Sequence, residues 1–367
     1  MEVRVAPTTY NSGSAARSRT PTPEARRVWI SLQTAMFLIG VLLVALLLFR
    51  PAIGLALMWN LLIPVAPALV TIAPGLWRNI CPMATTHMLP QKLGIAQNMK
   101  MPEWGAATLG TISVILLFIV VPMRRLGLNA DGTMTAIMLL SAACIAFTMG
   151  SLFEMRSGWC TSLCPIHPVE RLYGTNPAVS FKNARCTLCE ACSNPCPDST
   201  PEMTPTQAGP TKVQQWLGNF LVGSFPGFVW GWYQVPDHAP QDVGAAEIFA
   251  AYAWPFGAAL VTYLVFKIGE HLLHDRQEAR TTMHRIFAAA AISTYYWYRL
   301  PGPAFLLPDW FPTVSHLITT PFFFWFLVLR APKVSWLTRP VMASKYWFAR
   351  FDTTEKKNLI RVSPVKA

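Results

Sequence analysis

Long apolar segments are the feature that most constrains how this chain can fold. Six stretches are apolar over roughly the 20 residues that a helix needs to cross a bilayer, and two more polar stretches are plausible additions. The clear stretches are Val28–Phe49, Ala52–Ala73, Trp104–Met123, Met134–Phe153, Ile248–Phe266 and Pro312–Leu329; the additions are Trp216–Val235 and Ile286–Leu307. The sequence therefore predicts an all-α polytopic membrane protein with about eight transmembrane helices.

The distribution of charge predicts how these segments are oriented. The net charge of +12 comes mainly from the two ends of the chain and from the connection Lys267–Arg285, whereas Pro236–Glu247 has three acidic residues and no Lys or Arg. Cytoplasmic loops are enriched in Lys and Arg, so we expect both termini on the cytoplasmic side of the inner membrane. Arg124 and Arg125 are the one exception to this pattern. The basic residues are thus assigned to membrane topology and not to nucleic-acid binding.

The cysteines gather between the predicted spans. We divide the chain into a disordered basic cytoplasmic tail (1–27), a four-helix transmembrane region (28–153) with a cytoplasmic loop (75–103), a cysteine-rich cytoplasmic loop (154–212), a second transmembrane region (213–331) and a basic cytoplasmic tail (332–367). All cysteines except Cys144 fall in the two loops. The cytosol keeps thiols reduced, which favours metal binding over disulfides. Cys144 lies within a span, and we expect it to be a small buried apolar residue.

One run in the larger loop has a specific spacing. Cys186, Cys189, Cys192 and Cys196 are separated by two, two and three residues, and Pro197 follows. This is the bacterial-ferredoxin pattern for a [4Fe–4S] cluster. Structural zinc sites typically use two separated Cys-x2-4-Cys pairs, which this run does not match. The spacing therefore predicts a small ferredoxin-like insert in residues 154–212.

The ferredoxin pattern also predicts that the cluster takes a ligand from elsewhere. In two-cluster ferredoxins the fourth cysteine of such a run ligates the other cluster. Upstream, Cys160 and Cys164 are three residues apart and Pro165 follows, which repeats the end of the run. By the same rule Cys164 completes the cluster of Cys186, Cys189 and Cys192.

This assignment leaves open whether the chain binds a second cluster. Cys160 and Cys196 would face a second site, and Cys81, followed by Pro82, offers a third thiolate. A fourth ligand has several candidates, which are Glu154, Ser157, His87, His167 and Cys144. We expect one cluster and keep a second as the alternative, with Cys81, Cys160, Cys164, Cys186, Cys189, Cys192 and Cys196 as the candidate ligands.

At this point the chain resembles the membrane-bound ferredoxin-type iron–sulfur proteins of the nitrate reductase, nitrous-oxide reductase and cytochrome-oxidase maturation systems. The resemblance covers about residues 75–200 and is carried by Gly158-Trp159-Cys160, Cys164-Pro165 and the run Cys186–Pro197. It implies electron passage between the quinone pool or a cytoplasmic reductant and a partner at the membrane. Family members commonly have two full Cys-x3-Cys-Pro motifs and two ferredoxin motifs, whereas this chain has one of each plus the remnant at Cys81.

The sequence thus favours an electron-transfer component of a redox system over a stand-alone enzyme. We expect membrane lipid and redox proteins as partners, and quinone as a candidate ligand. A redox-sensing regulator and a metalloenzyme assembly factor are the alternatives. Histidines outside the cysteine loops are weaker candidates: His271 and His274 suit a solvated helix end, and His316 suits a bond between helices.

Overall fold

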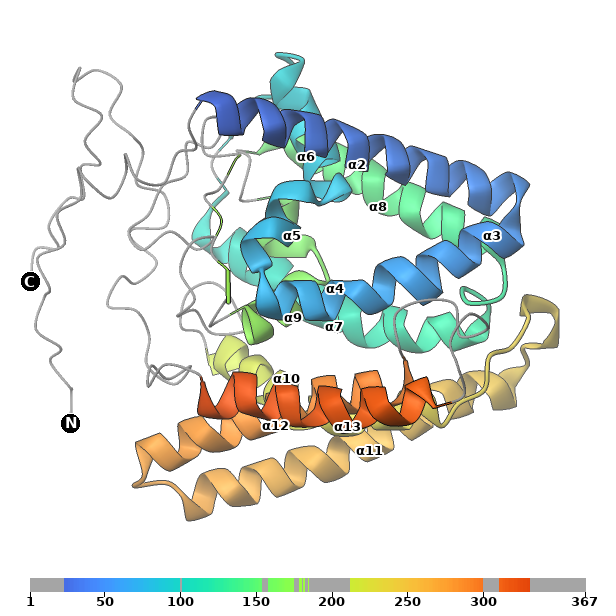
Figure 1. Ribbon diagram of the computed structural model, residues 1–367. Coiled ribbons are helices and arrows are strands. Elements are labelled where there is room, and N and C mark those ends of the chain that lie inside the picture. Colours follow the sequence, from blue (N-terminus) through green and yellow to red (C-terminus); the bar gives the residue numbers. More distant parts are fainter. Residues whose placement is uncertain are drawn as a thin grey trace, which may run out of the picture.

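The computed structural model describes residues 23–99, 101–153, 158–174, 178–179, 181, 184, 212–299 and 310–330. These residues are mostly helical, and none of them lies in a β-strand (Figure 1). The ferredoxin run Cys186–Cys196 lies outside the described residues, as do the expected tail 332–367 and most of the tail 1–27. The all-α prediction is confirmed for the part of the chain that is described.

The first half of the chain alternates long and short helices. They are α2 (Pro23–Phe49), α3 (Pro51–Leu55), the π-helical η1 (Ala56–Leu62), α4 (Ile63–Ile72), α5 (Pro74–Ile80), α6 (Pro82–Lys92), α7 (Glu103–Met123), the short η2 (Arg124–Leu126) and α8 (Gly132–Leu152). Proline opens several of these helices, where its missing N–H would have no partner. The Asp131 carboxylate caps α8 by accepting from the Met134 backbone N–H at 2.7 Å.

The rest of the described chain forms four longer helices and four short elements. They are η3 (Trp159–Leu163), α9 (His167–Tyr173), α10 (Lys212–Tyr233), η4 (Pro240–Asp242), α11 (Ala245–Leu272), α12 (Gln277–Tyr298), α13 (Phe311–Phe324) and η6 (Trp325–Leu329). Figure 1 shows α10 to α13 as one layer beneath the first-half helices. Glu247 accepts from the Gly244 backbone N–H at 2.9 Å and so fixes the start of α11.

Among the described residues, five helical segments are long and apolar enough to cross a membrane: Pro23–Phe49, Pro51–Ile72, Thr108–Leu126, Gly132–Leu152 and Ala245–Leu272. The other three expected spans are also helical where described, in α10, α12 and α13 with η6. Two of them differ from the five in a clear way. Helix α12 is more polar, since it begins among charged residues at Gln277, and the apolar segment of α13 and η6 is shorter, since it runs only from Thr313 to Leu329. A multi-pass membrane protein is therefore supported, while the count of eight spans stays a prediction.

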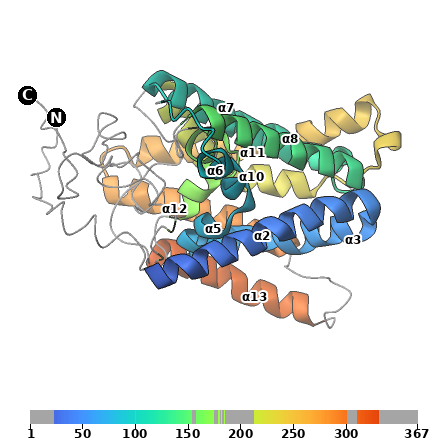
Figure 2. The ribbon, with the colours of Figure 1, turned by 90° about the horizontal axis from the view of Figure 1, so that it is seen from above.

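The connections between the long helices lie at two opposite ends of the bundle. At one end lie the α2–α3 corner, η2 and η4, and at the other lies the turn between α11 and α12 (Figures 1 and 2). The short helices α5 and α9 lie toward the α11–α12 end in Figure 1. We call this the cysteine end, because it holds Cys81, Cys160 and Cys164, and the opposite one the arginine end, because it holds Arg124 and Arg125.

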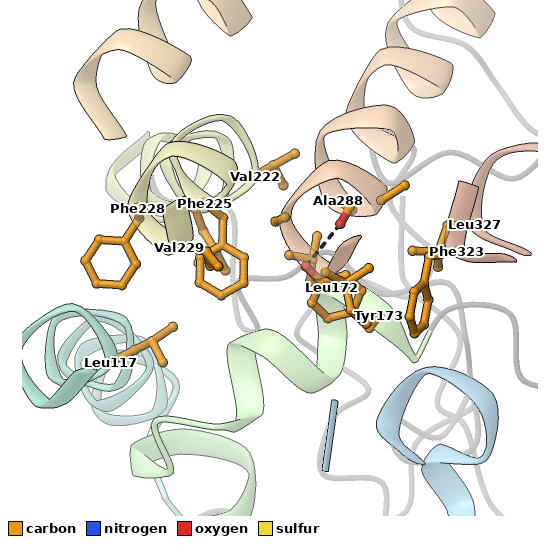
Figure 3. Close-up of a cluster of buried hydrophobic side chains, with 14 of the residues drawn as sticks. Leu117, Leu172, Tyr173, Val222, Phe225, Phe228, Val229, Ala288, Phe323 and Leu327 are labelled. Atoms are coloured by element: carbon orange, nitrogen blue, oxygen red, sulfur yellow. Dashed lines mark hydrogen bonds between the residues drawn. The ribbon is translucent and has the colours of Figure 1, made fainter. Parts of the chain in front are cut away.

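Short helix α9 is anchored in the main hydrophobic core (Figure 3). Leu172 and Tyr173 are fully buried among side chains of α10, α12 and α13. The Tyr173 hydroxyl donates to the Ala288 carbonyl oxygen of α12 at 3.1 Å, so the polar end of this ring is satisfied inside the core. The short stretch after Cys164 is thereby fixed to the long helices and is not a loose loop.

Close helix crossings depend on small residues at several places, of which two illustrate the pattern. A Cβ at Gly150 on α8 would overlap the His87 carbonyl oxygen of α6, and one at Gly227 on α10 would overlap the Ala258 carbonyl oxygen of α11. Small residues let helix backbones approach in this way in membrane proteins. The α6–α8 crossing matters most here, because it places the helix that follows Cys81 against α8.

The arginine end explains the exception to the predicted charge pattern. The Arg124 guanidinium is buried, lying 4.0 Å from the ring centre of Trp59 and 4.7 Å from that of Trp232. Arg125 donates to the Asp237 carboxylate at 2.9 Å. Stacking on indole rings stabilises a desolvated cation by about 2 kcal/mol. These two arginines are packing residues, so they need not obey the rule for solvated loop charges.

Reporter fusions test the topology that follows from these two ends. Alkaline phosphatase fused after Asp242 should be active, because the charge asymmetry of the sequence predicts that η4 is on the exported side. The same reporter fused after Asp275 should be inactive, since α11 lies between the two sites. Equal activity at both positions would contradict a membrane-crossing α11.

Candidate functional site

Three of the predicted cysteine ligands are described, and two of them lie at helix boundaries. Cys81 follows the last residue of α5 and directly precedes α6. Cys160 lies within η3, and Cys164 follows the last residue of η3. The structure thus brings together two loops that are about 80 residues apart in the sequence.

The two described Cys-Pro pairs share one backbone geometry. Cys81 has φ −54° and ψ 121°, and Cys164 has φ −62° and ψ 119°. A residue before proline is pushed away from the helical region toward extended angles. Each cysteine therefore ends one helix, and the chain resumes a helix shortly afterwards. The remnant at Cys81 and the full motif at Cys164 are structurally equivalent turns.

The thiols of Cys81 and Cys160 lie close enough to Cys164 to affect the pKa of its thiol. Burial raises the pKa of the Cys164 thiol well above its usual range, and the two neighbouring thiols raise it further. Binding to a metal would replace this proton, as thiolate ligation requires. Among the described residues, no group of three Cys, His, Asp or Glu side chains is arranged to hold a metal ion.

Backbone contacts fix the Cys164 turn on the long helices. The buried Ser113 hydroxyl of α7 donates to the Cys164 carbonyl oxygen at 2.7 Å. The Cys164 backbone N–H donates to the Trp159 carbonyl oxygen at 2.9 Å, which closes η3. With α9 anchored in the core on the other side, Cys164 is held from both directions.

A buried ion pair joins the two cysteine turns. Arg78 of α5, three residues before Cys81, donates from Nε to the Glu170 carboxylate of α9. Burial alone would raise the pKa of Glu170, but Arg78 and His167 outweigh it and lower the pKa to about 2. The carboxylate is therefore charged at neutral pH, and the pair connects α5 to α9.

The histidines considered as extra ligands have other partners. His87 is fully buried, and its Nδ1 lies 2.9 Å from the Ala146 carbonyl oxygen of α8. His167 accepts a hydrogen bond from Arg171 Nε at 3.4 Å and lies near Glu170. Burial lowers the pKa of His167. Both rings hold packed structure together, whereas Glu154 and Ser157 lie outside the described residues.

Other candidates lie away from the cysteine turns. Cys144 is exposed on α8, so the prediction that it is buried was wrong. The helix faces outward at this position, where an apolar thiol suits lipid contact. His271 and His274 are exposed, as expected of a solvated helix end. His316 stacks on Trp297 with ring centres 4.4 Å apart, and this ring contact takes the place of the expected helix–helix hydrogen bond.

Sequence reasoning missed the polar residues that organise this end. Arg78, Asn79 and Glu170 are buried or nearly so, and none was singled out. A usable signal was present, because Arg78 and Asn79 immediately precede Ile80-Cys81-Pro82 in an otherwise apolar stretch. Polar groups in such surroundings are costly unless they are paired, which indicates a structural or functional role.

Comparison with protein families, curated proteins and solved structures finds no match to this chain.

Replacing Glu170 tests whether the buried pair holds the cysteine end together. Glu170→Gln keeps the shape but leaves Arg78 facing a neutral amide, and breaking a buried pair from one side costs about 3–5 kcal/mol. Denaturant-induced unfolding in detergent at neutral pH should show that the free energy of unfolding of the variant is lower by this amount. Glu278→Gln, at an exposed position on α12, is the control and should have almost no effect.

The pH dependence of the unfolding free energy provides a second test of the Arg78–Glu170 pair. The folded pKa of Glu170 lies below its ordinary value of 4.5, so its stabilising contribution is complete above about pH 4.5 and is lost as the pH falls toward 2. The difference in unfolding free energy between the wild type and Glu170→Gln should therefore shrink over that range. Equal stability of the two proteins at neutral pH would contradict a stabilising pair.

Proposed function

We propose that this chain is a membrane-anchored [4Fe–4S] protein that passes single electrons between a cytoplasmic or quinone donor and a membrane-associated redox partner. The observation that carries the proposal is the spacing of Cys186, Cys189, Cys192 and Cys196 before Pro197. This spacing is specific for iron–sulfur ligation by thiolates. When bound, such a cluster supplies one-electron chemistry.

The described thiols are of the chemical kind that the proposal needs. A cluster of this class takes cysteine thiolates, and Cys81 and Cys160 lie near enough to the buried Cys164 to raise the pKa of its thiol. In the proposed assignment Cys164 joins Cys186, Cys189 and Cys192, and a second cluster would draw on Cys81, Cys160 and Cys196. The shared geometry of the Cys81 and Cys164 turns favours a role for Cys81.

The surrounding residues would set the properties of the site. Reduction potentials of such clusters depend on local charge, hydrogen bonds and solvent exposure. Here the Arg78–Glu170 pair brings one positive and one negative charge next to the turns, so it adds rigidity with little net charge. The apolar helices would hold the site at the membrane surface, within reach of a membrane-associated partner and of the quinone pool.

Metal analysis tests the proposal directly. Protein purified without oxygen should contain about four irons with a matching amount of acid-labile sulfide, or about eight if a second cluster forms. Reduction by one electron should produce the EPR signal of a paramagnetic [4Fe–4S] cluster. Zinc without acid-labile sulfide would contradict the proposal.

A cysteine variant separates electron transfer from a structural role for the cluster. Cys189→Ser should abolish reduction of the partner by removing a thiolate ligand, while folded protein persists in the membrane. Cys144→Ser is the matched control, because Cys144 is exposed on α8 and is not a ligand in the proposed assignment. Loss of the folded protein itself in Cys189→Ser would indicate a structural cluster instead.

A further inference from the structure

Three arginines lie close together at the arginine end. Arg124 and Arg125 follow the last residue of α7, and Arg299 follows the last residue of α12. The buried Arg124 guanidinium lies close enough to the other two to be repelled by their charges. Asp237 pairs with Arg125 at 2.9 Å, whereas neither Arg124 nor Arg299 pairs with a carboxylate in the described part of the chain. Two positive charges are therefore left without a counter-charge from these residues.

The hydrogen bonds of these two arginines go to neutral groups. Arg299 donates to the Trp59 carbonyl oxygen at 3.1 Å and to the side-chain oxygen of Asn60, both in the π-helical η1. Arg124 donates from Nε to the Asn129 side-chain oxygen at 3.2 Å. Neutral acceptors position a guanidinium without cancelling its charge, and a buried cation is costly unless an anion accompanies it.

Three buried polar atoms beside the arginines have no hydrogen-bond partner among the described residues. They are the Trp232 indole nitrogen and the hydroxyl oxygens of Tyr233 and Tyr295. The Tyr233 ring adjoins both other rings, with ring centres 4.5 Å and 6.1 Å apart. Both tyrosines lie close enough to Arg124 and Arg299 to interact with their charges. A buried donor without a partner costs its full desolvation free energy, so a group of three indicates a bound acceptor.

We propose that this cluster binds a phosphate oxyanion, which is either the headgroup of an anionic phospholipid or free phosphate. Such a group supplies in one ligand the negative charge that Arg124 and Arg299 need and several acceptor oxygens. Tyr233, Tyr295 and Trp232 would donate to those oxygens. The planar guanidinium group matches the geometry of phosphate well. A neutral quinone would accept hydrogen bonds but would leave both positive charges uncompensated, so the charge of the cluster favours an anion.

The position of the cluster suits the headgroup level of a bilayer. Helices α7, α10 and α12 all end around it, on the side of η2 and η4 in Figure 1. The exposed Tyr298 stacks on Tyr233 with ring centres 4.6 Å apart, so the cluster lies next to the protein surface. Trp and Tyr are enriched at this level of the membrane, and basic sites between helices bind anionic headgroups. The inference uses no residue of the cysteine end and does not depend on the iron–sulfur function.

Calorimetric titration of full-length, delipidated protein in detergent tests the site. The probes are dihexanoyl phosphatidylglycerol, inorganic phosphate and dihexanoylglycerol, which lacks the phosphate. One equivalent of a phosphate-bearing probe should bind, and dihexanoylglycerol should not. Binding of the phosphatidylglycerol alone would identify a lipid headgroup, whereas binding of inorganic phosphate would identify the free anion. Equal binding of phosphatidylglycerol and dihexanoylglycerol would overturn the proposal.

A double variant tests the residues of the site without removing a charge or a ring. Tyr233→Phe combined with Tyr295→Phe should weaken binding of the phosphate-bearing probe at least about tenfold, because hydrogen bonds to a charged group are lost. The thermal stability of the delipidated variant should not fall, because these hydroxyls have no partner among the described residues. Tyr252→Phe is the matched control. Its hydroxyl donates to the Ile119 carbonyl oxygen at 3.2 Å, and its loss should leave the affinity unchanged.

Three results would overturn the proposal. The first is that the wild type binds neither phosphate-bearing probe, and the second is that the double variant binds as tightly as the wild type. The third is that a neutral short-chain ubiquinone binds more tightly than either phosphate-bearing probe, which would assign the cluster to a quinone.

Discussion

The buried pair between Arg78 and Glu170 is the interaction on which the cysteine end depends. It connects α5 to α9, and each of these helices adjoins a cysteine turn. A charged pair in an apolar protein is stable only when its geometry is good and its remaining polar atoms are satisfied. Here His167 and Arg171 continue the network on one side, and the anchoring of Tyr173 in the core fixes it on the other.

The two ends of the bundle use buried polar groups in different ways. At the arginine end, cations are stacked on indole rings and paired with Asp237, which closes the helix connections. At the cysteine end, polar side chains hold short segments next to one another and leave the thiols grouped beside them. The second arrangement brings thiols near one another, which is why we assign the proposed function to that end.

The sequence predicted the helices better than it predicted their contacts. Apolar length alone located the membrane-spanning candidates, since it is a local property of the chain. The sequence assigned Cys164 to one cluster and Cys81 to another, so the nearness of these two cysteines was not foreseen, because it depends on how α5 and α9 pack. Asn79 and Arg78 were missed for the same reason: their partners, Ala184 and Glu170, are distant in the sequence. Cys144 was misjudged because helix periodicity gave no indication of which face meets lipid.

Mössbauer spectroscopy of the iron-57-labelled protein, isolated without oxygen, tests the central claim most directly. The account predicts that nearly all protein-bound iron gives the quadrupole doublet of a [4Fe–4S] cluster with cysteine ligands, and that Cys189→Ser diminishes this signal. Iron found only as mononuclear or adventitious species, with the same spectrum in wild type and variant, would contradict it.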